Sequence, residues 1–346
     1  HFSLDATAAI NQLNKNISAQ IATFPLPSIS SGLSFEFSSD LGTFTKKHES
    51  LGPLFAERPR TIGDGKLNAN ISYTFFKYDK FEGQSLNSIT ASANHDYDII
   101  PPPTTPTSFE LDTLALRFDL GIKAKILAFG ATYGLTDRLD LGILVPYVWL
   151  DMSVRSHADL IVSPANPFPT AHLFGAESPD DAASGSADGI GDILLHAKYH
   201  WLKSDTHNLA AALLVKTETG DADNFLGTGD TTLRPYLIYS RSFGAFTPHL
   251  NLGYRFNLQT SKKDAIDYAI GFDYGSERYT FAAEILGSRY VNGDAIGDNI
   301  VNGAVGFKWS PATSKNFVFS ANALFPLNDS GLRSNLVTTV ALEYAF

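Results

Sequence analysis

The chain has 346 residues, of which 44% are hydrophobic and 12% aromatic, and its formal net charge is −10 at pH 7. No apolar run approaches the roughly 20 residues of a membrane-spanning helix, so any membrane crossing must be made by strands. The negative charge, without a basic stripe, argues against a nucleic-acid partner. Cysteine is absent, which fits an oxidising envelope compartment but is also common in the cytosol.

The first 60 residues lack the alternating pattern of the rest of the chain. Residues 4–24 suit a short amphipathic helix, which the proline at position 25 would end. Further on, Phe35, Phe37 and Phe44 flank a Ser-Ser-Asp-Leu-Gly turn, a pattern that predicts a hairpin. His1 follows no signal-peptide regions, so we expect the chain to be the mature form after removal of a signal peptide.

Alternation of apolar and polar residues recurs about a dozen times from residue 65 onward. Between residues 246 and 259, for example, Leu250 and Leu252 share one face while His249 and Asn251 share the other. A strand with lipid on one side and a wet lumen on the other requires this division. We predict strands near 65–79, 110–135, 138–153, 189–202, 208–219, 231–242, 246–259, 265–274, 278–290, 299–309, 316–326 and 333–346.

These segments predict an all-β fold, a transmembrane antiparallel β-barrel of about twelve strands in the bacterial outer membrane, with both termini periplasmic. Long connections at 80–109 and 154–188 would be extracellular loops. Segment 110–135 is too long for one plain strand, and a bulge, an extension above the membrane or an extra hairpin would each explain it. An extra hairpin would raise the count toward fourteen. Residues 64–346 would form the barrel, and residues 1–63 an N-terminal plug or a periplasmic tail.

Two kinds of motif carry a resemblance to a known family. One is the strand-turn-strand stretch YGLTDRLDLGILVPYV at residues 133–148, and the other is a Gly-Asp pair before a strand, in GIGD at 189–192 and GTGD at 227–230. From about residue 110 to 346 the sequence resembles outer-membrane transporters grouped with the meta-pathway of phenol degradation. That resemblance implies a barrel that takes up small hydrophobic or aromatic compounds, and it does not extend to the N-terminal segment.

The same motifs also have a purely physical interpretation. Thr136 and Asp137 can hold a tight reversal through hydrogen bonds from their side chains to the backbone. Asp192 and Asp230 follow glycines at strand starts near the outer rim. There a carboxylate would cap loop amides or pair with a neighbouring arginine, and we favour these structural roles over ligand contact.

Charged and polar residues on the inward faces form a set of both signs that would line the lumen. A lumen of this kind can cross-link itself with ion pairs and leave little open bore. For each residue we favour a structural role over a defined ligand contact. The lumen-lining candidates are Arg117, Asp140, Asp192, His196, Lys198, His200, Lys216, Glu218, Arg234, His249, Arg255, Asp267, Asp273, Arg278, Glu284, Lys308 and Glu343.

Neither a metal site nor an active site is predicted. His196 and His200 share a face, but residues four apart on a strand are separated by about 13 Å, too far for two ligands of one zinc ion. Catalytic residues are not assigned, because the sequence has no Gly-x-Ser-x-Gly elbow and no short-range Ser/His pair. We therefore expect no enzyme and no cofactor, and keep a barrel hydrolase only as a remote third possibility.

The long loops are proline-rich and contain apolar residues that are candidates for capturing a solute. They are Ile99, Ile100, Phe168, Leu173 and Phe174. Such residues also suit a contact surface, so a docking barrel whose loops bind a surface partner, or a homo-oligomer, is the alternative function. The leading hypothesis is an outer-membrane channel in contact with lipid, for passive uptake of small hydrophobic or aromatic solutes. The sequence leaves open the substrate, the open diameter and the position of the N-terminal segment.

Overall fold

A computed structural model describes residues 2–3, 28, 33, 35–38, 43–46, 50–95, 113–161, 180–292, 297–311 and 316–346. Twelve of its strands form a closed antiparallel barrel, in which the first barrel strand pairs with the last. They are β4 (Leu67–Tyr78), β8 (Thr113–Thr136), β9 (Leu139–Ile161), β11 (Leu194–Leu202), β12 (His207–Lys216), β13 (Thr232–Arg241), β14 (Phe246–Asn257), β15 (Ala265–Gly275), β16 (Tyr279–Tyr290), β17 (Asn299–Trp309), β18 (Phe317–Pro326) and β20 (Val337–Ala345). The predicted fold and its twelve strands are confirmed.

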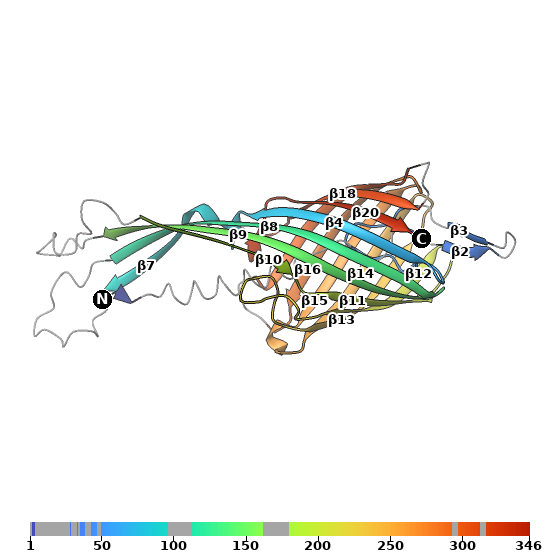
Figure 1. Ribbon diagram of the computed structural model, residues 1–346, viewed down its shortest axis with the longest axis horizontal. Helices are drawn as coiled ribbons and strands as arrows, with labels where there is room; N and C mark the ends of the chain where they lie inside the picture. Colours follow the sequence, from blue (N-terminus) through green and yellow to red (C-terminus); the bar gives the residue numbers. More distant parts are fainter. Residues whose placement is uncertain are drawn as a thin grey trace, which may run out of the picture.

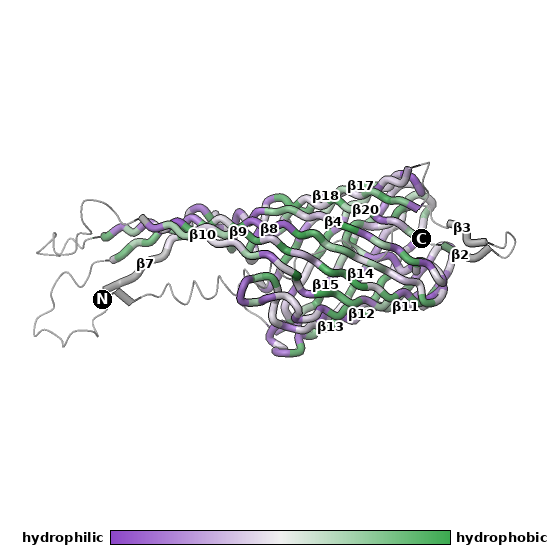
Figure 2. The backbone as a smooth tube through the Cα atoms, viewed as in Figure 1, coloured by the Kyte–Doolittle hydropathy of each residue, from purple (hydrophilic) through white to green (hydrophobic). Residues whose placement is uncertain are grey.

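The barrel strands follow the alternation of their sequences. On β14, Leu250 and Leu252 are exposed on the outer surface, whereas Thr247, His249 and Asn251 between and beside them are buried. Hydrophobic and hydrophilic residues accordingly alternate along the strands in the tube view (Figure 2). The outer surface therefore presents an apolar, aromatic-rich belt of the kind that a lipid-facing barrel requires.

Two further strands, β7 (Ile89–His95) and β10 (Asp180–Ile190), pair outside the closed barrel. β7 pairs with the first part of β8, and β10 pairs with β9 from Tyr147 to His157. These strands project from one end of the barrel, away from the C-terminus (Figure 1). The excess length of segment 110–135 is thus an extension of β8. We call the end of the barrel from which these strands project the loop end, and the end beside the C-terminus the turn end.

The boundaries differ from the prediction in two places beside this extension. β9 continues to Ile161, eight residues beyond the predicted 153, because β8 and β10 pair with its two edges. The predicted strand 189–202 is divided, since β10 ends at Ile190 and β11 begins at Leu194. Both boundaries depend on hydrogen bonds to neighbouring strands, and the alternation of residues within one segment does not show where that pairing ends.

The smaller elements lie at the two ends of the barrel. β2 (Phe35–Ser38) and β3 (Thr43–Lys46) form the predicted hairpin, which lies beyond the turn end (Figure 1). At the loop end, β19 (Leu332–Arg333), β5 (Lys80–Phe81) and β6 (Gln84–Ser85) form a small sheet. There β1 (Phe2–Ser3) pairs with β7, so the first strand lies at the end opposite the C-terminus and the prediction that both termini share one side is wrong. Two short 3₁₀ helices are η1 (Leu86–Ser88) and η4 (Ser261–Lys263). The helix expected over residues 4–24 lies outside the described residues, and no described helix is long and apolar enough to span a membrane.

Candidate functional site

Residues 50–63, which we call the luminal segment, are held inside the barrel. Their backbone or side chains bond to inward residues of β9, β11, β13, β14 and β16. Leu51, Ala56 and Ile62 are completely buried or nearly so. The segment leaves the interior past Gly134, where an added Cβ would lie 1.8 Å from the carbonyl oxygen of Gly63. Only glycine permits this close approach of the two backbones.

Glu284 on β16 binds the backbone of the luminal segment. Its two carboxylate oxygens accept hydrogen bonds from the amides of Leu54 at 2.5 Å, Phe55 at 3.0 Å and Ala56 at 2.9 Å. One turn of backbone thus presents three donors to a single buried anion. Charge-assisted hydrogen bonds of this kind are about twice as strong as neutral ones, so Glu284 is a principal anchor of the segment.

Glu57 forms a second anchor and reaches three strands. Tyr236 on β13 donates to its carboxylate, and Nε2 of His196 on β11 lies 3.3 Å from the other oxygen. The backbone of Glu57 bonds in addition to the Asn251 side chain on β14. These contacts connect a buried carboxylate of the segment to one sector of the barrel wall.

Asp140 on β9 anchors the far end of the segment. Its two oxygens accept from the amide of Ile62 at 3.2 and 3.1 Å, and Lys198 Nζ lies 3.7 Å away. Lys198 also donates to the carbonyl of Arg58 at 3.3 Å. In the turn between β8 and β9, the Thr136 hydroxyl accepts from the amides of Arg138 and Leu139, the side-chain-to-backbone bonding predicted for Thr136.

Arg58 brings a positive charge into the middle of this polar interior, next to the buried carboxylate of Glu57. It is 6% exposed, and among the described residues its Nε and Nη2 have no hydrogen-bond partner. Burial and, to a smaller extent, nearby Arg60 lower the pKa of Arg58 to about 10, against the opposing effect of Asp273. The guanidinium therefore keeps its charge at neutral pH. Beside it, the other inward pairs are His249 with Asp273, and Lys308 with Glu343 at 3.7 Å.

Toward the loop end the interior changes from polar to apolar. Inward side chains of β4, β8, β9, β17, β18 and β20, together with one leucine each from η1, β19 and the loop of residues 217–231, form one buried cluster, which we call the apolar wall. It consists of Phe76, Tyr78, Leu86, Ile122, Ala124, Ile126, Val148, Leu150, Leu226, Ala304, Leu324, Leu332 and Val337. Phe55 of the luminal segment and Leu286 of β16 pack against it. The luminal segment thus crosses the polar half of the lumen, and hydrophobic side chains gather on one side of the half above it.

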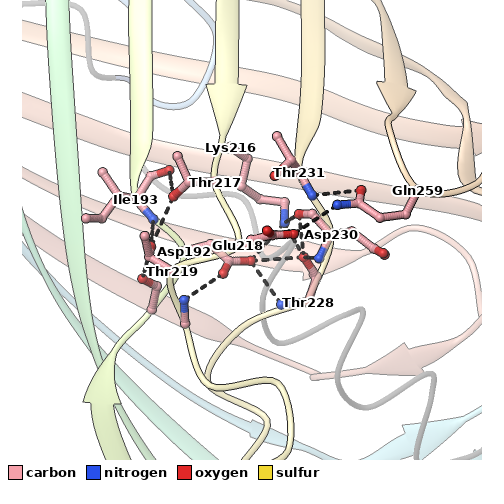
Figure 3. A network of polar contacts seen from close by, with 12 residues as sticks. Asp192, Ile193, Lys216, Thr217, Glu218, Thr219, Thr228, Asp230, Thr231 and Gln259 are labelled. Atoms are coloured by element: carbon pink, nitrogen blue, oxygen red, sulfur yellow. Dashed lines mark hydrogen bonds and ion pairs between the residues drawn. The ribbon is translucent and has the colours of Figure 1, made fainter.

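A polar network holds the loop of residues 217–231 at the rim beside the apolar wall (Figure 3). Asp192 accepts from Lys216 Nζ at 2.8 Å, from the Thr228 amide at 2.9 Å and from the Gly220 amide at 3.0 Å. Lys216 also donates to the carbonyl of Asp230. Asp192 therefore caps loop amides, as predicted, and its ionic partner is a lysine. Held this way, the loop inserts Leu226 into the apolar wall.

Across the barrel from the apolar wall, two arginines share one carboxylate. Arg234 Nη1 on β13 lies 3.5 Å from Asp267 Oδ2 on β15, and Arg255 Nη2 on β14 lies 3.4 Å from Oδ1. Arg255 also donates to the Ser288 hydroxyl at 2.8 Å. The three charged side chains are partly exposed. This cluster carries one positive charge more than its single carboxylate neutralises.

Most of the lumen-lining candidates lie on inward faces, and three do not. Those that are buried are Asp140, Asp192, His196, Lys198, His200, Lys216, His249, Asp273, Glu284, Lys308 and Glu343. Arg117 is an exposed residue of the β8 extension, and Glu218 and Arg278 are exposed in connections. The histidines His196, His200 and His249 bond to a tyrosine, an asparagine and an aspartate. All five loop-capture candidates, Ile99, Ile100, Phe168, Leu173 and Phe174, lie outside the described residues.

Sequence reasoning missed the apolar wall, and it left open whether residues 1–63 lie inside the barrel or below it. On β8, the inward residues Ile122, Ala124 and Ile126 alternate with outward Lys123 and Lys125, the reverse of the expected polarity. The signal was present in this pair of lysines, because charged residues avoid the lipid-facing surface near the membrane midplane. The luminal segment gave no periodic signal, since it is neither helix nor strand.

Comparisons with known proteins agree with this architecture. The profile of the family “Putative MetA-pathway of phenol degradation” matches residues 107–331. Among solved structures, the COG4313 outer membrane channel from Pseudomonas putida F1 is 16% identical, with a TM-score of 0.50, and the match covers 83% of this chain and 98% of that one. The P. putida toluene transporter TodX is a more distant likeness, 10% identical with a TM-score of 0.38, covering 84% of this chain and 92% of that one. No curated protein matches the sequence.

Proposed function

Because the chain belongs to the MetA-pathway of phenol degradation family and folds as an outer-membrane β-barrel, we propose that it is a channel for passive uptake of small hydrophobic or aromatic molecules. The observation that carries this proposal is the apolar wall, a continuous cluster of buried hydrophobic side chains on the inside of a barrel. A lumen built for hydrophilic solutes would be polar throughout.

The apolar wall supplies the affinity in this proposal. A solute entering from the loop end, which would be extracellular, leaves water and gains about 25 cal/mol per Å² of apolar surface that it buries. An aromatic ring thus has a favourable position against Phe76, Val148 and Leu324. Movement is down a gradient, so the mechanism needs neither nucleotide nor redox cofactor. The loop residues that sequence analysis singled out, Ile99 and Phe168 among them, would add to capture.

The luminal segment is the obstruction in the same proposal, and it is the part of the predicted plug of residues 1–63 that would block the barrel of residues 64–346. The contacts of Glu284, Glu57 and Asp140 support this role, because they fix the segment across the polar half of the lumen. A solute held against the apolar wall then has two exits. It passes the luminal segment when that segment moves, or it leaves sideways into the bilayer.

A docking function is the second candidate, and the extension of β7, β8, β9 and β10 beyond the barrel favours it. This sheet projects from the loop end (Figure 1), where a surface partner would reach it. Deleting the projecting ends of these four strands distinguishes the docking function from the channel function. A channel would keep its uptake after that deletion, whereas a docking barrel would lose its partner.

The test of the channel proposal compares uptake with and without an intact apolar wall. Host cells with the protein in their outer membrane are expected to take up dilute radiolabelled toluene several-fold faster than cells without it. The variant Val148→Asp with Leu324→Asp should lose this gain, because two buried carboxylates make the wall costly for hydrocarbon. Heat-modifiable electrophoretic mobility confirms that each barrel is folded. The proposal would be refuted if cells with the folded protein, cells with the folded variant and cells with neither took up toluene at the same rate.

A further inference from the structure

The cluster of Arg234, Arg255 and Asp267 faces the apolar wall across the barrel. Following hydrogen-bonded neighbours around the closed ring, β14 is the sixth strand from β4 in both directions, so Arg255 and Phe76 belong to opposite sides. Arg234 and Asp267 lie on the strands that flank β14. One side of this part of the lumen is therefore hydrocarbon and the other carries guanidinium groups.

The two sides meet at the same height in the barrel. On β16, the inward residue Leu286 packs against the apolar wall, and Ser288, the next inward residue, accepts the hydrogen bond from Arg255. On β13, Tyr236 follows Arg234 by one inward position and donates to Glu57 of the luminal segment. The arginine cluster thus lies directly above the segment that closes the lumen.

The cluster has unused capacity for an anion. The Nε atoms of Arg234 and Arg255 are buried and have no hydrogen-bond partner within the part of the chain that the structure describes. The guanidinium groups pack over the rings of Tyr236 at 4.9 Å and Tyr290 at 5.9 Å, which hold them in place. The side chain of Arg234 is 32% exposed and that of Arg255 is 15% exposed, so solvent reaches both.

The carboxylates on neighbouring elements are engaged elsewhere. Glu57 is bonded to Tyr236 and pairs with His196. Asp264 accepts from the amide of Asn257 at 2.8 Å and from a tyrosine. Asp230 pairs with Lys263. Asp267 forms ion pairs with both arginines, and Glu57 adds a longer-range attraction at Arg234, so the two guanidinium groups share a single directly paired carboxylate.

We propose that Arg234 and Arg255 bind the carboxylate of an amphiphilic substrate whose ring or chain lies against the apolar wall. The inference rests on the proposed uptake function and names its substrate class: aromatic or aliphatic carboxylic acids, preferred over neutral molecules of the same shape. Guanidinium groups suit this task, since their planar N–H pairs match the two oxygens of a carboxylate. Asp267 holds both arginines in position and limits their net charge.

The experiment measures binding of phenylbutyrate and phenylbutanol, which share a tail and differ in the head group. The full chain in lipid nanodiscs is titrated calorimetrically with each probe at neutral pH, and empty nanodiscs give the lipid background. The variants are Arg234→Gln, Arg255→Gln and Asp267→Asn. Arg241→Gln is the matched control, because Arg241 ends the same strand β13 at the turn end and stacks over Phe243. Heat-modifiable mobility verifies the fold of each.

We expect the wild-type protein to bind phenylbutyrate at least tenfold more tightly than phenylbutanol, a difference of about 1.4 kcal/mol. Each arginine variant should lose most of this preference and keep its affinity for phenylbutanol, Asp267→Asn should increase the preference, and Arg241→Gln should leave it unchanged. Equal binding of the two probes, or a preference that survives both arginine substitutions, would overturn the inference and leave the uptake proposal standing. Binding of neither probe would contradict both.

Discussion

Asn251 pairs with the backbone of Glu57 in both directions, as a neighbouring strand would. Its Oδ1 accepts from the Glu57 amide at 2.6 Å, and its Nδ2 donates to the Glu57 carbonyl at 2.9 Å. Both groups are buried, and 194 residues separate them in the chain. A side chain of the barrel wall thus replaces the strand partner that the luminal segment lacks, which explains how an irregular backbone is kept inside a barrel.

The substitution Asn251→Val should loosen the luminal segment. It leaves a buried amide and a buried carbonyl unpaired, at a cost of about 1–3 kcal/mol for each group. We expect more frequent or larger openings in single-channel recordings and faster hydrogen exchange at the Glu57 amide. Asn335→Ala, at an exposed position of the loop end, is the control. If Asn251→Val shows wild-type conductance together with wild-type exchange, the pair does not restrain the segment.

Glu284 offers a graded test of the same restraint. Glu284→Gln removes the charge but keeps one acceptor oxygen, whereas Glu284→Ala removes every acceptor for the amides of Leu54, Phe55 and Ala56. Hydrogen bonds to a charged group contribute about 1.5–3 kcal/mol. Exchange of these three amides should therefore accelerate from wild type to Glu284→Gln to Glu284→Ala. Glu277→Gln, in an exposed turn, should not change it. An identical rate in all four proteins would show that the carboxylate is not an anchor.

The barrel could be predicted from sequence because its outer belt follows a local rule. Alternation on β14 identified which residues face out, and the same rule held around most of the ring. The rule failed on part of β8, where hydrophobic side chains occupy the inner face and lysines the outer face. The polarity of a residue there does not indicate whether its side chain points into the barrel or out of it. The bonds of Asn251 with Glu57 and of Glu284 with Leu54 join residues about two hundred positions apart, and no local pattern encodes such a pairing.

Deleting residues 1–60 should open the polar half of the lumen. The deletion removes the partners of Glu284 and Asn251, and the barrel strands, which begin at Leu67, remain complete. We expect a clear rise in single-channel conductance in planar bilayers, with heat-modifiable mobility retained. A folded deletion variant that conducts no better than the full chain would remove the plug from the proposed mechanism.

Lys216 should hold the rim loop of residues 217–231 through its buried pair with Asp192. Replacing it with methionine keeps the length of the side chain but leaves the carboxylate with only neutral donors, and breaking a buried pair this way costs about 3–5 kcal/mol. Protease cleavage within residues 217–231 should then become faster, and toluene uptake should change with it, because Leu226 leaves the apolar wall.

The exposed Lys262→Met is the matched control for Lys216→Met, and it should be cleaved like the wild-type protein. The double variant Lys216→Met with Asp192→Asn removes the stranded charge and should recover part of the protection, since a neutral amide costs less to bury than an unpaired carboxylate. The size of that recovery shows how much of the lost protection comes from the unpaired charge and how much from the lost packing of the lysine side chain. If the double variant were cleaved as fast as the sum of the two single variants predicts, the ion pair would not be what holds the loop.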